Sequence, residues 1–156
     1  MNLEDFKVIK DRYDAIVAEY KKNMQDFGKD LFSQTAKNVF EKNPNLKSFG
    51  WTQYTPYFND GGVCEFNVYY EYNMYINNKD IDVYDPDHWL KPNYPYAPNF
   101  KDYEFDTMQE LISAVKDVLN VLELFSKDDL EIMFGDHAEI TAYNNGQISV
   151  EKYDHD

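Results

Sequence analysis

The chain has 156 residues, and 29 acidic residues against 15 Lys and Arg give it a formal net charge of −14. Such an acidic excess repels phosphates and anionic lipid, which argues against direct binding of nucleic acid or of a membrane surface. Aromatic residues make up 17% of the chain, too many for a disordered acidic protein. We therefore expect a single folded domain over residues 1–156 with a hydrophobic core of its own.

The cysteine content and the first residues bear on the cellular compartment. The single cysteine, Cys64, cannot form an intramolecular disulfide, and the opening MNLEDFKVIK lacks the charged and then apolar pattern of a secretory leader. No apolar run approaches the roughly 18 residues that a membrane helix needs. We expect a cytoplasmic protein with no cofactor.

The charge is divided unevenly along the chain. Residues 1–48 hold 8 of the 29 acids and 9 of the 15 bases, a net of +1, which leaves 21 acids and 6 bases in residues 49–156, a net of −15. These later acids alternate with Tyr, Phe and Val. This pattern favours an acidic face on a folded domain over an acidic tail.

Apolar residues at spacings of three and four predict a long amphipathic helix at the start of the chain. The stripe begins at Leu3, continues to Phe40, and stops before Asn43-Pro44, where proline disfavours helix in the preceding residue. Gly28 interrupts the stripe, so a kink or break there is left open.

From Phe49 the period becomes two, which predicts strands over 49–58 and 63–76 joined by a turn at 59–62. A two-residue turn at Asp60-Gly61 would pair Gln53 with Val68 and Trp51 with Tyr70. A second turn at 77–79 predicts a third strand over 81–84.

Residues 85–102 hold four prolines and four aromatic residues. We expect an extended loop there, pinned by its aromatic side chains. A second long helix is predicted to start with Asp106 as its N-cap, and a short helix to follow from Ser126 and to end at Gly135.

The final segment predicts a hairpin around Asn144-Asn145-Gly146, in one of two registers. A two-residue loop would mix apolar and charged residues on both faces, whereas a three-residue loop pairs Ala142 with Ile148 and gives one apolar face. We prefer the second register. It sets Glu139 opposite Glu151, beside His137 and Tyr153, and two facing carboxylates invite a cation, a basic partner or a raised carboxyl pKa.

The sequence offers few groups for catalysis. Each histidine follows an aspartate, as Asp87-His88, Asp136-His137 and Asp154-His155, so that His88, His137 and His155 are weak candidates for metal ligands. The close ligand spacing of zinc sites is absent, and we expect polar turns instead. Cys64 fits a core thiol better than a nucleophile, and no phosphate-binding or serine-hydrolase motif occurs.

Two segments carry a family resemblance. FGWTQYTPYFNDGGVCEF, residues 49–66, and FGDHAEITAYNNGQISVEKYDHD, residues 134–156, resemble small acidic proteins encoded by tailed bacteriophages, a group with no assigned activity. The resemblance covers about a quarter of the chain and carries over no catalytic residues. It implies an accessory phage protein in the cytoplasm of a bacterial host cell, a setting where compact acidic proteins inhibit host enzymes by occupying a nucleic-acid groove.

These observations predict an α+β fold with a meander of about three antiparallel strands, a C-terminal hairpin, and helices on one sheet face. We expect a non-enzymatic acidic protein that binds a basic, nucleic-acid-binding surface of a host protein. The predicted contact residues are Asp80, Asp82, Asp85, Asp87, Trp89, Glu139, Glu151, Tyr153, Asp154 and Asp156.

Three other interpretations stay open at this point. The same acids could serve solubility alone. A small-ligand or nucleotide sequestering protein could use the aromatic loop as a lid, although residues 49–156 hold few bases for phosphate. A metal-dependent hydrolase built on the Asp-His pairs is the enzymatic alternative.

Overall fold

The computed structural model describes residues 1–58 and 61–155, so Asn59 and Asp60 of the predicted 59–62 turn and the predicted contact at Asp156 lie outside it. The helices are α1 (Leu3–Lys42), α2 (Met108–Glu123) and α3 (Lys127–Phe134). The strands are β1 (Ser48–Tyr54), β2 (Asn67–Val68), β3 (Met74–Ile76), β4 (Lys79–Ile81), β5 (Ala138–Tyr143) and β6 (Ile148–Lys152). Two short 3₁₀ helices, Pro86–His88 and Phe100–Tyr103, lie in the predicted loop.

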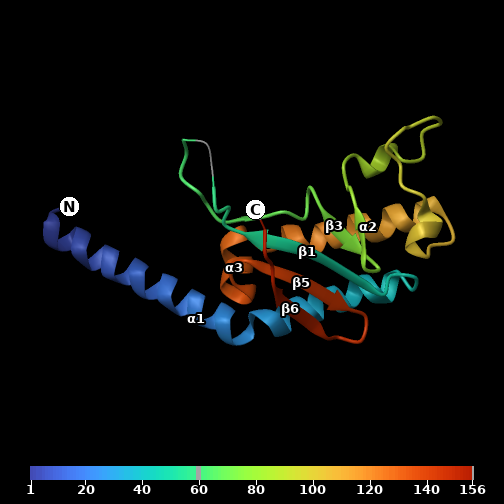
Figure 1. The fold of residues 1–156 in the computed structure, drawn as a ribbon. Coiled ribbons are helices and arrows are strands. Elements are labelled where there is room, and N and C mark those ends of the chain that lie inside the picture. Colours follow the sequence, from blue (N-terminus) through green and yellow to red (C-terminus); the bar gives the residue numbers. More distant parts are fainter. Residues whose placement is uncertain (59–60, 156) are drawn as a thin grey trace.

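The described strands form one antiparallel sheet of six strands in the order β4-β3-β1-β5-β6, with β2 paired to the end of β1 (Figure 1). The α+β class is confirmed, but the C-terminal hairpin is not a separate unit. It joins the meander because β5 pairs with β1 along six residues, from Ser48 opposite Tyr143 to Gln53 opposite Ala138. Strand β1 is therefore the centre of the sheet.

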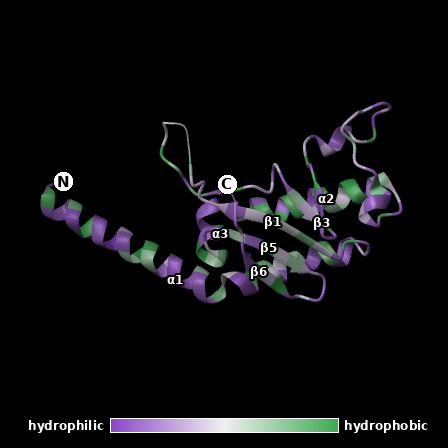
Figure 2. Cartoon of the chain, viewed as in Figure 1, coloured by the Kyte–Doolittle hydropathy of each residue, from purple (hydrophilic) through white to green (hydrophobic). Residues whose placement is uncertain are grey.

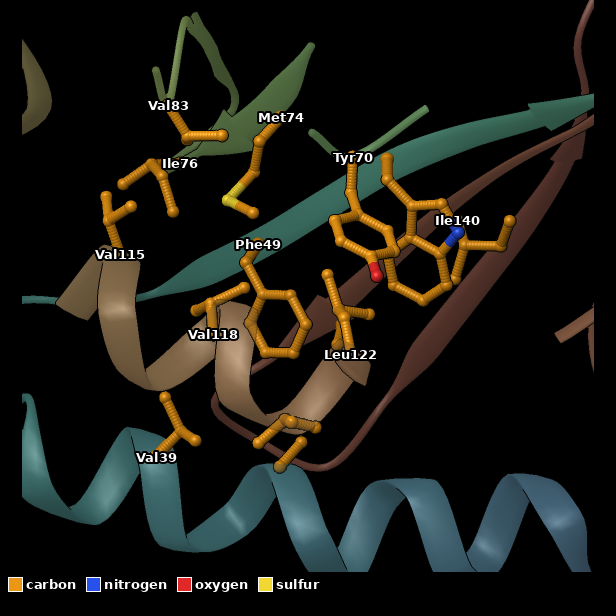
Figure 3. Packing of buried hydrophobic residues seen from close by; sticks show 14 of the residues in the cluster. Val39, Phe49, Tyr70, Met74, Ile76, Val83, Val115, Val118, Leu122 and Ile140 are labelled. Atoms are coloured by element: carbon orange, nitrogen blue, oxygen red, sulfur yellow. The ribbon is translucent and has the colours of Figure 1, made fainter. Parts of the chain in front are cut away.

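The hydrophobic core lies between one face of this sheet and the three helices. Phe32 of α1 contacts Phe49 and Trp51 of β1, with ring centroids 6.2 and 5.6 Å apart, and it also meets Phe125 and Phe134 at 5.5 Å. Figure 3 shows side chains of α2 and of the sheet meeting in the same layer. Gln53, the next residue of β1 on this face, is fully buried and donates from its amide nitrogen to carbonyls of Leu130 and Gly135. All three helices thus pack on the same side of the sheet.

Helix α1 is continuous through Gly28, so the predicted long helix is confirmed and no break occurs there, although the apolar residues of its N-terminal half are exposed. It begins with a capping box between Asn2 and Asp5. A Cβ built on Gly28 would lie 2.5 Å from Cγ of Met133 in α3. Gly28 therefore permits close packing of α1 against α3. Beyond that contact the N-terminal part of α1 projects away from the body (Figure 1).

The meander keeps the predicted register only in part. Gln53 pairs with Val68 as expected, but Trp51 pairs with Met74 and not with Tyr70. A turn intervenes, in which the Asn73 N–H donates to the Tyr69 carbonyl at 2.9 Å. The strand is therefore interrupted, and Tyr70 turns into the core instead.

One strand and one helix cap differ from the prediction by one or two residues. The strand predicted over 81–84 is β4, Lys79–Ile81, and it starts two residues early because the turn before it has only two residues, Asn77 and Asn78, both with positive φ. The N-cap of α2 is Thr107 and not Asp106, since the Thr107 hydroxyl accepts from the Glu110 N–H.

The predicted cap of the short helix at Ser126 and its end at Gly135 are confirmed. The three-residue register of the last hairpin is confirmed as well. Ala142 lies opposite Ile148, and Gly146 has φ +90.

Gly50 lies in the middle of β1, where glycine has poor strand propensity and valine good propensity. A Cβ at this position would lie 2.5 Å from the Ile140 carbonyl oxygen, a backbone atom that the β1–β5 pairing holds in place. We predict that Gly50→Val lowers the free energy of unfolding by about 2–3 kcal/mol, measured by urea denaturation.

Ser149→Val is the matched control, because Ser149 lies half-buried on the edge strand β6. It should change stability by about 0.5 kcal/mol or less. A Gly50→Val variant as stable as the wild type would contradict the close approach of β1 and β5.

Candidate functional site

Strand alternation gives the sheet a second face, opposite the helices. Phe49, Trp51 and Gln53 point toward the helices, so Gly50, Thr52 and Tyr54 point the other way. The registers of β3 to β6 bring further residues onto this side, namely Tyr75, Asp80, Glu139, Thr141, Ser149 and Glu151. Its accessible part lies toward the edge strands, where Asp80 and Glu151 are exposed, whereas Thr52 at its centre is only 2% exposed. We call this side the open sheet face.

Three carboxylates, which we call the sheet acids, lie on the open sheet face. They are Asp80, Glu139 and Glu151. Glu139 faces Glu151 across the β5–β6 pair, as predicted, and Asp80 faces Tyr75 across the β3–β4 pair. Within the described residues none of the three forms an ion pair with Lys, Arg or His. Their negative charge is therefore uncompensated by this part of the chain.

The negative charges of the sheet acids shift the pKa values of neighbouring groups. Partial burial raises the pKa of Glu139, and the charges of Glu151 and Asp80 raise it further. The pKa of the Tyr75 phenol is raised by burial and then by Glu139 and Asp80. Four groups from strands β3 to β6 therefore share one negative field, and an added positive charge would be stabilised there.

The other acids predicted around the second turn do not join the sheet acids. Asp82 accepts the Tyr84 N–H at 3.0 Å, and Asp85 lies 3.8 Å from Nδ1 of His88. Asp87 pairs with Lys116 of α2 at 2.8 Å, and this hydrogen bond and charge lower the pKa of Asp87.

Trp89 is buried, with 4% of its surface exposed, and its indole N–H donates to the Tyr84 carbonyl. The prediction of a partner contact at Trp89 is therefore corrected. Its ring anchors the 85–102 loop to the core instead.

The predicted contacts near the C-terminus, Asp154 and Tyr153, both interact with other residues of the chain. Asp154 lies 3.7 Å from the Lys152 ammonium group, so its charge is partly neutralised within the chain. Tyr153 is half-buried, and its ring packs 5.5 Å from Tyr54 of β1.

Beside the sheet acids lies a group of rings, of which the sequence predicted only His137 and Tyr153 on a shared face. We call it the aromatic stack, and its members are Tyr54, Tyr57, Tyr69, His137, Tyr153 and His155. His155 lies in the middle, 3.8 Å from Tyr54 and 4.3 Å from Tyr57 between ring centroids. Nδ1 of His137 lies 2.8 Å from Nε2 of His155. Sequence reasoning could find part of this stack, because the register of the last hairpin places His137 beside Tyr153. The position of His155 is not given by that register.

Asp136 fixes the chain between α3 and β5 at the edge of the aromatic stack. Its carboxylate accepts from the Thr55 N–H and from the Thr55 hydroxyl, both at 2.7 Å. Burial raises the pKa of Asp136, but these hydrogen bonds and the His137 N–H outweigh it, so the pKa is lowered overall. Asp136 is therefore a structural acceptor.

The structure does not bring the three histidines together. His88 contacts Asp85 and Tyr94, away from the His137–His155 pair. Among residues 1–58 and 61–155, no group of three or more His, Cys, Asp or Glu side chains is arranged to hold a metal ion.

Two surface hollows lie elsewhere. One, of about 330 Å³, lies between α1 and the β5–β6 turn, and Lys37 is its basic residue. The other, of about 740 Å³, lies between the end of α1 and the start of α2, and Lys42 is its basic residue. Neither hollow is lined by the aromatic loop, which was the lid expected for a nucleotide-sequestering protein.

Comparison with models of protein families, with curated proteins and with solved structures finds no match to this chain. The phage resemblance is therefore neither supported nor opposed by a relative. In the described part of the chain, no helix combines the length and apolar character required to cross a membrane.

The raised pKa of Glu139 has a consequence for stability. The folded chain holds this proton more tightly than the unfolded chain, so ionised Glu139 lowers stability above its folded pKa. That cost fades as the pH falls through the raised value toward the ordinary one of 4.5. We predict that Glu139→Gln raises the melting temperature near pH 7 and gives little gain near pH 4.

Glu71→Gln removes the same charge from an exposed turn and serves as the control. Circular dichroism at the two pH values measures both variants. An equal gain for Glu139→Gln and Glu71→Gln at neutral pH would show that only the total charge matters.

Proposed function

We propose that the chain is a non-enzymatic binding protein that engages a basic surface of another protein through its open sheet face. The observation that carries the proposal is the set of three sheet acids without an ion pair among the described residues. Facing carboxylates such as Glu139 and Glu151 destabilise a sheet by mutual repulsion. A Lys or Arg of a partner would remove that cost on binding.

The tyrosines around the sheet acids support a protein partner in preference to a free cation. Tyr54, Tyr75 and Tyr153 are half-buried, so their rings are held in place while part of each stays accessible. Rigid tyrosines give a large contact area at low entropic cost, and they contact both apolar groups and the stems of Lys and Arg. The resulting surface suits a partner that is basic and partly apolar.

The charge distribution favours a surface that otherwise binds nucleic acid. Residues 49–156 carry a net charge of −15, and a field of that size accelerates association with a positive surface. A surface evolved to bind phosphates offers that positive field. Occupying it would block nucleic acid sterically and electrostatically, the action of a phage-type inhibitor of a host protein.

Capture from a bacterial lysate at low and at high salt, with mass spectrometry of the bound proteins, tests the proposal. We predict recovery of a basic, nucleic-acid-binding protein at low salt and its loss at high salt. With that protein in hand, the double variant Asp80→Asn, Glu151→Gln should bind about tenfold more weakly.

The control is the double variant Asp11→Asn, Asp14→Asn, which removes the same charge from exposed positions on α1. It should bind within about twofold of the wild type, because its acids lie off the open sheet face. Recovery of no basic partner, binding that is indifferent to salt, or equal loss in both double variants would contradict the proposal.

A further inference from the structure

The first half of α1 is a helix with almost no support from the rest of the chain. We call residues 3–23 the projecting segment, and none of its residues is buried. Its contacts with the body are at its end, where the Tyr20 hydroxyl donates to Asp129 of α3 at 2.5 Å and Ile16 and Val17 lie beside α3. Figure 1 shows the segment extending into solvent. Most helix stability in proteins comes from packing of an amphipathic face, and this segment packs almost none of its own.

The exposed apolar residues of the projecting segment follow a coiled-coil pattern. Phe6, Ile9, Tyr13, Ile16 and Tyr20 are spaced alternately by three and four, and their exposed fractions run from 49% to 66%. Asn23 takes the next position, and Phe27 resumes the pattern at 63% exposure. We call these residues the seam. Hydrophobic and hydrophilic positions alternate along the segment in Figure 2.

Apolar residues that repeat every 3.5 residues form a stripe along one helix. This stripe stays in contact with a partner over several turns only when the partner is another helix with the same repeat, as in a coiled coil. A globular surface or a single groove does not require that period. The pattern therefore indicates a helix as the occupant of the seam.

The exposed area is sufficient for a stable pair. Aromatic side chains present roughly 150–250 Å² each, so half to two-thirds exposure leaves about 100 Å² on each residue. The six apolar residues of the seam, from Phe6 to Phe27, therefore offer about 600 Å² on one helix when the two isoleucines are counted at a similar value. Two such helices would bury about 1,200 Å² in total, which reaches the lower end of specific protein interfaces.

The charge distribution of the chain favours a second copy as the partner of the seam. The projecting segment holds five acids and five bases, a net charge of zero, so two such segments do not repel each other. The remaining residues of each chain, 24–156, carry the whole net charge of −14 and do repel, and an antiparallel arrangement separates them at opposite ends. When Tyr13 lies opposite Ile16 of the second copy in such a pair, the flanking positions set Arg12 across from its Glu19 and Asp5 across from its Asp26, each twice by symmetry. The flanking charges therefore balance, and the separation of the two acidic bodies favours the antiparallel direction.

A lipid surface fits less well. Asp5, Asp11, Asp14 and Glu19 interleave with the bases of the projecting segment, and the acidic body would be held against an anionic membrane. We propose that two copies of the chain associate through an antiparallel coiled coil of their projecting segments, with the seam as its core.

Sedimentation equilibrium of the full chain over a range of concentrations tests this association. The expected mass is twice the 18.5 kDa of one chain. Ile16→Lys places a charge in the seam and should weaken the dimer about tenfold or more, with the sheet signals of the circular dichroism spectrum unchanged.

Val8→Lys is the matched control, because Val8 is 52% exposed and lies outside the seam. It should leave the dimer intact. A monomer at every concentration, or equal loss in both variants, would overturn the proposal, as would a monomer that binds phosphatidylglycerol vesicles through Ile16.

Disulfide formation tests the direction. In a Cys64→Ser background, a mixture of Phe6→Cys and Asn23→Cys chains should form the mixed disulfide on mild oxidation, because these positions face each other in the antiparallel register. Disulfides that join only Phe6→Cys chains to one another would show parallel helices and overturn the antiparallel pair.

Discussion

Phe32 of α1 packs against Phe49 and Trp51 of β1, and the rest of the fold depends on this contact. It brings the long helix onto the central strand, and Phe125 and Phe134 close around the same ring. Because successive residues of a strand point to opposite sides, this packing commits every second residue of β1 to the other face. The open sheet face is thus a direct consequence of where the aromatic core lies.

The same constraint explains how much could be predicted from the sequence. Local signals were sufficient for α1, for the Ser126 cap and for the last hairpin, because each depends on residues near one another in the chain. The facing pair Glu139 and Glu151 followed from the apolar pattern of that hairpin alone. The pairing of β5 with β1 did not follow, since it joins residues about ninety positions apart and leaves no periodic signal.

Other parts of the site depended on tertiary packing. Trp89 was predicted as a contact, but its ring is buried in the core. Asp87 was predicted as a partner contact together with Asp80, but it forms an ion pair with Lys116 on α2. The aromatic stack needed three separate segments, around Tyr54, His137 and His155, to meet.

The two proposed surfaces lie on different parts of the molecule and use different physics. The open sheet face is acidic, and binding there should fall with salt. The seam of α1 is apolar in a nearly neutral segment, and its association should depend little on salt. An antiparallel dimer would present two open sheet faces at its opposite ends. A partner with repeated basic sites could then contact both faces, and the dimer would bind it more tightly than a monomer would.

The central claim is that a basic partner binds the open sheet face and not the helices. Amide chemical shifts of the labelled chain, recorded with and without the captured basic protein, locate the contact directly. The account predicts the largest changes at Tyr75, Asp80, Glu139 and Glu151 on strands β3 to β6. Changes confined to α1 and α2, with the open sheet face unaffected, would contradict it.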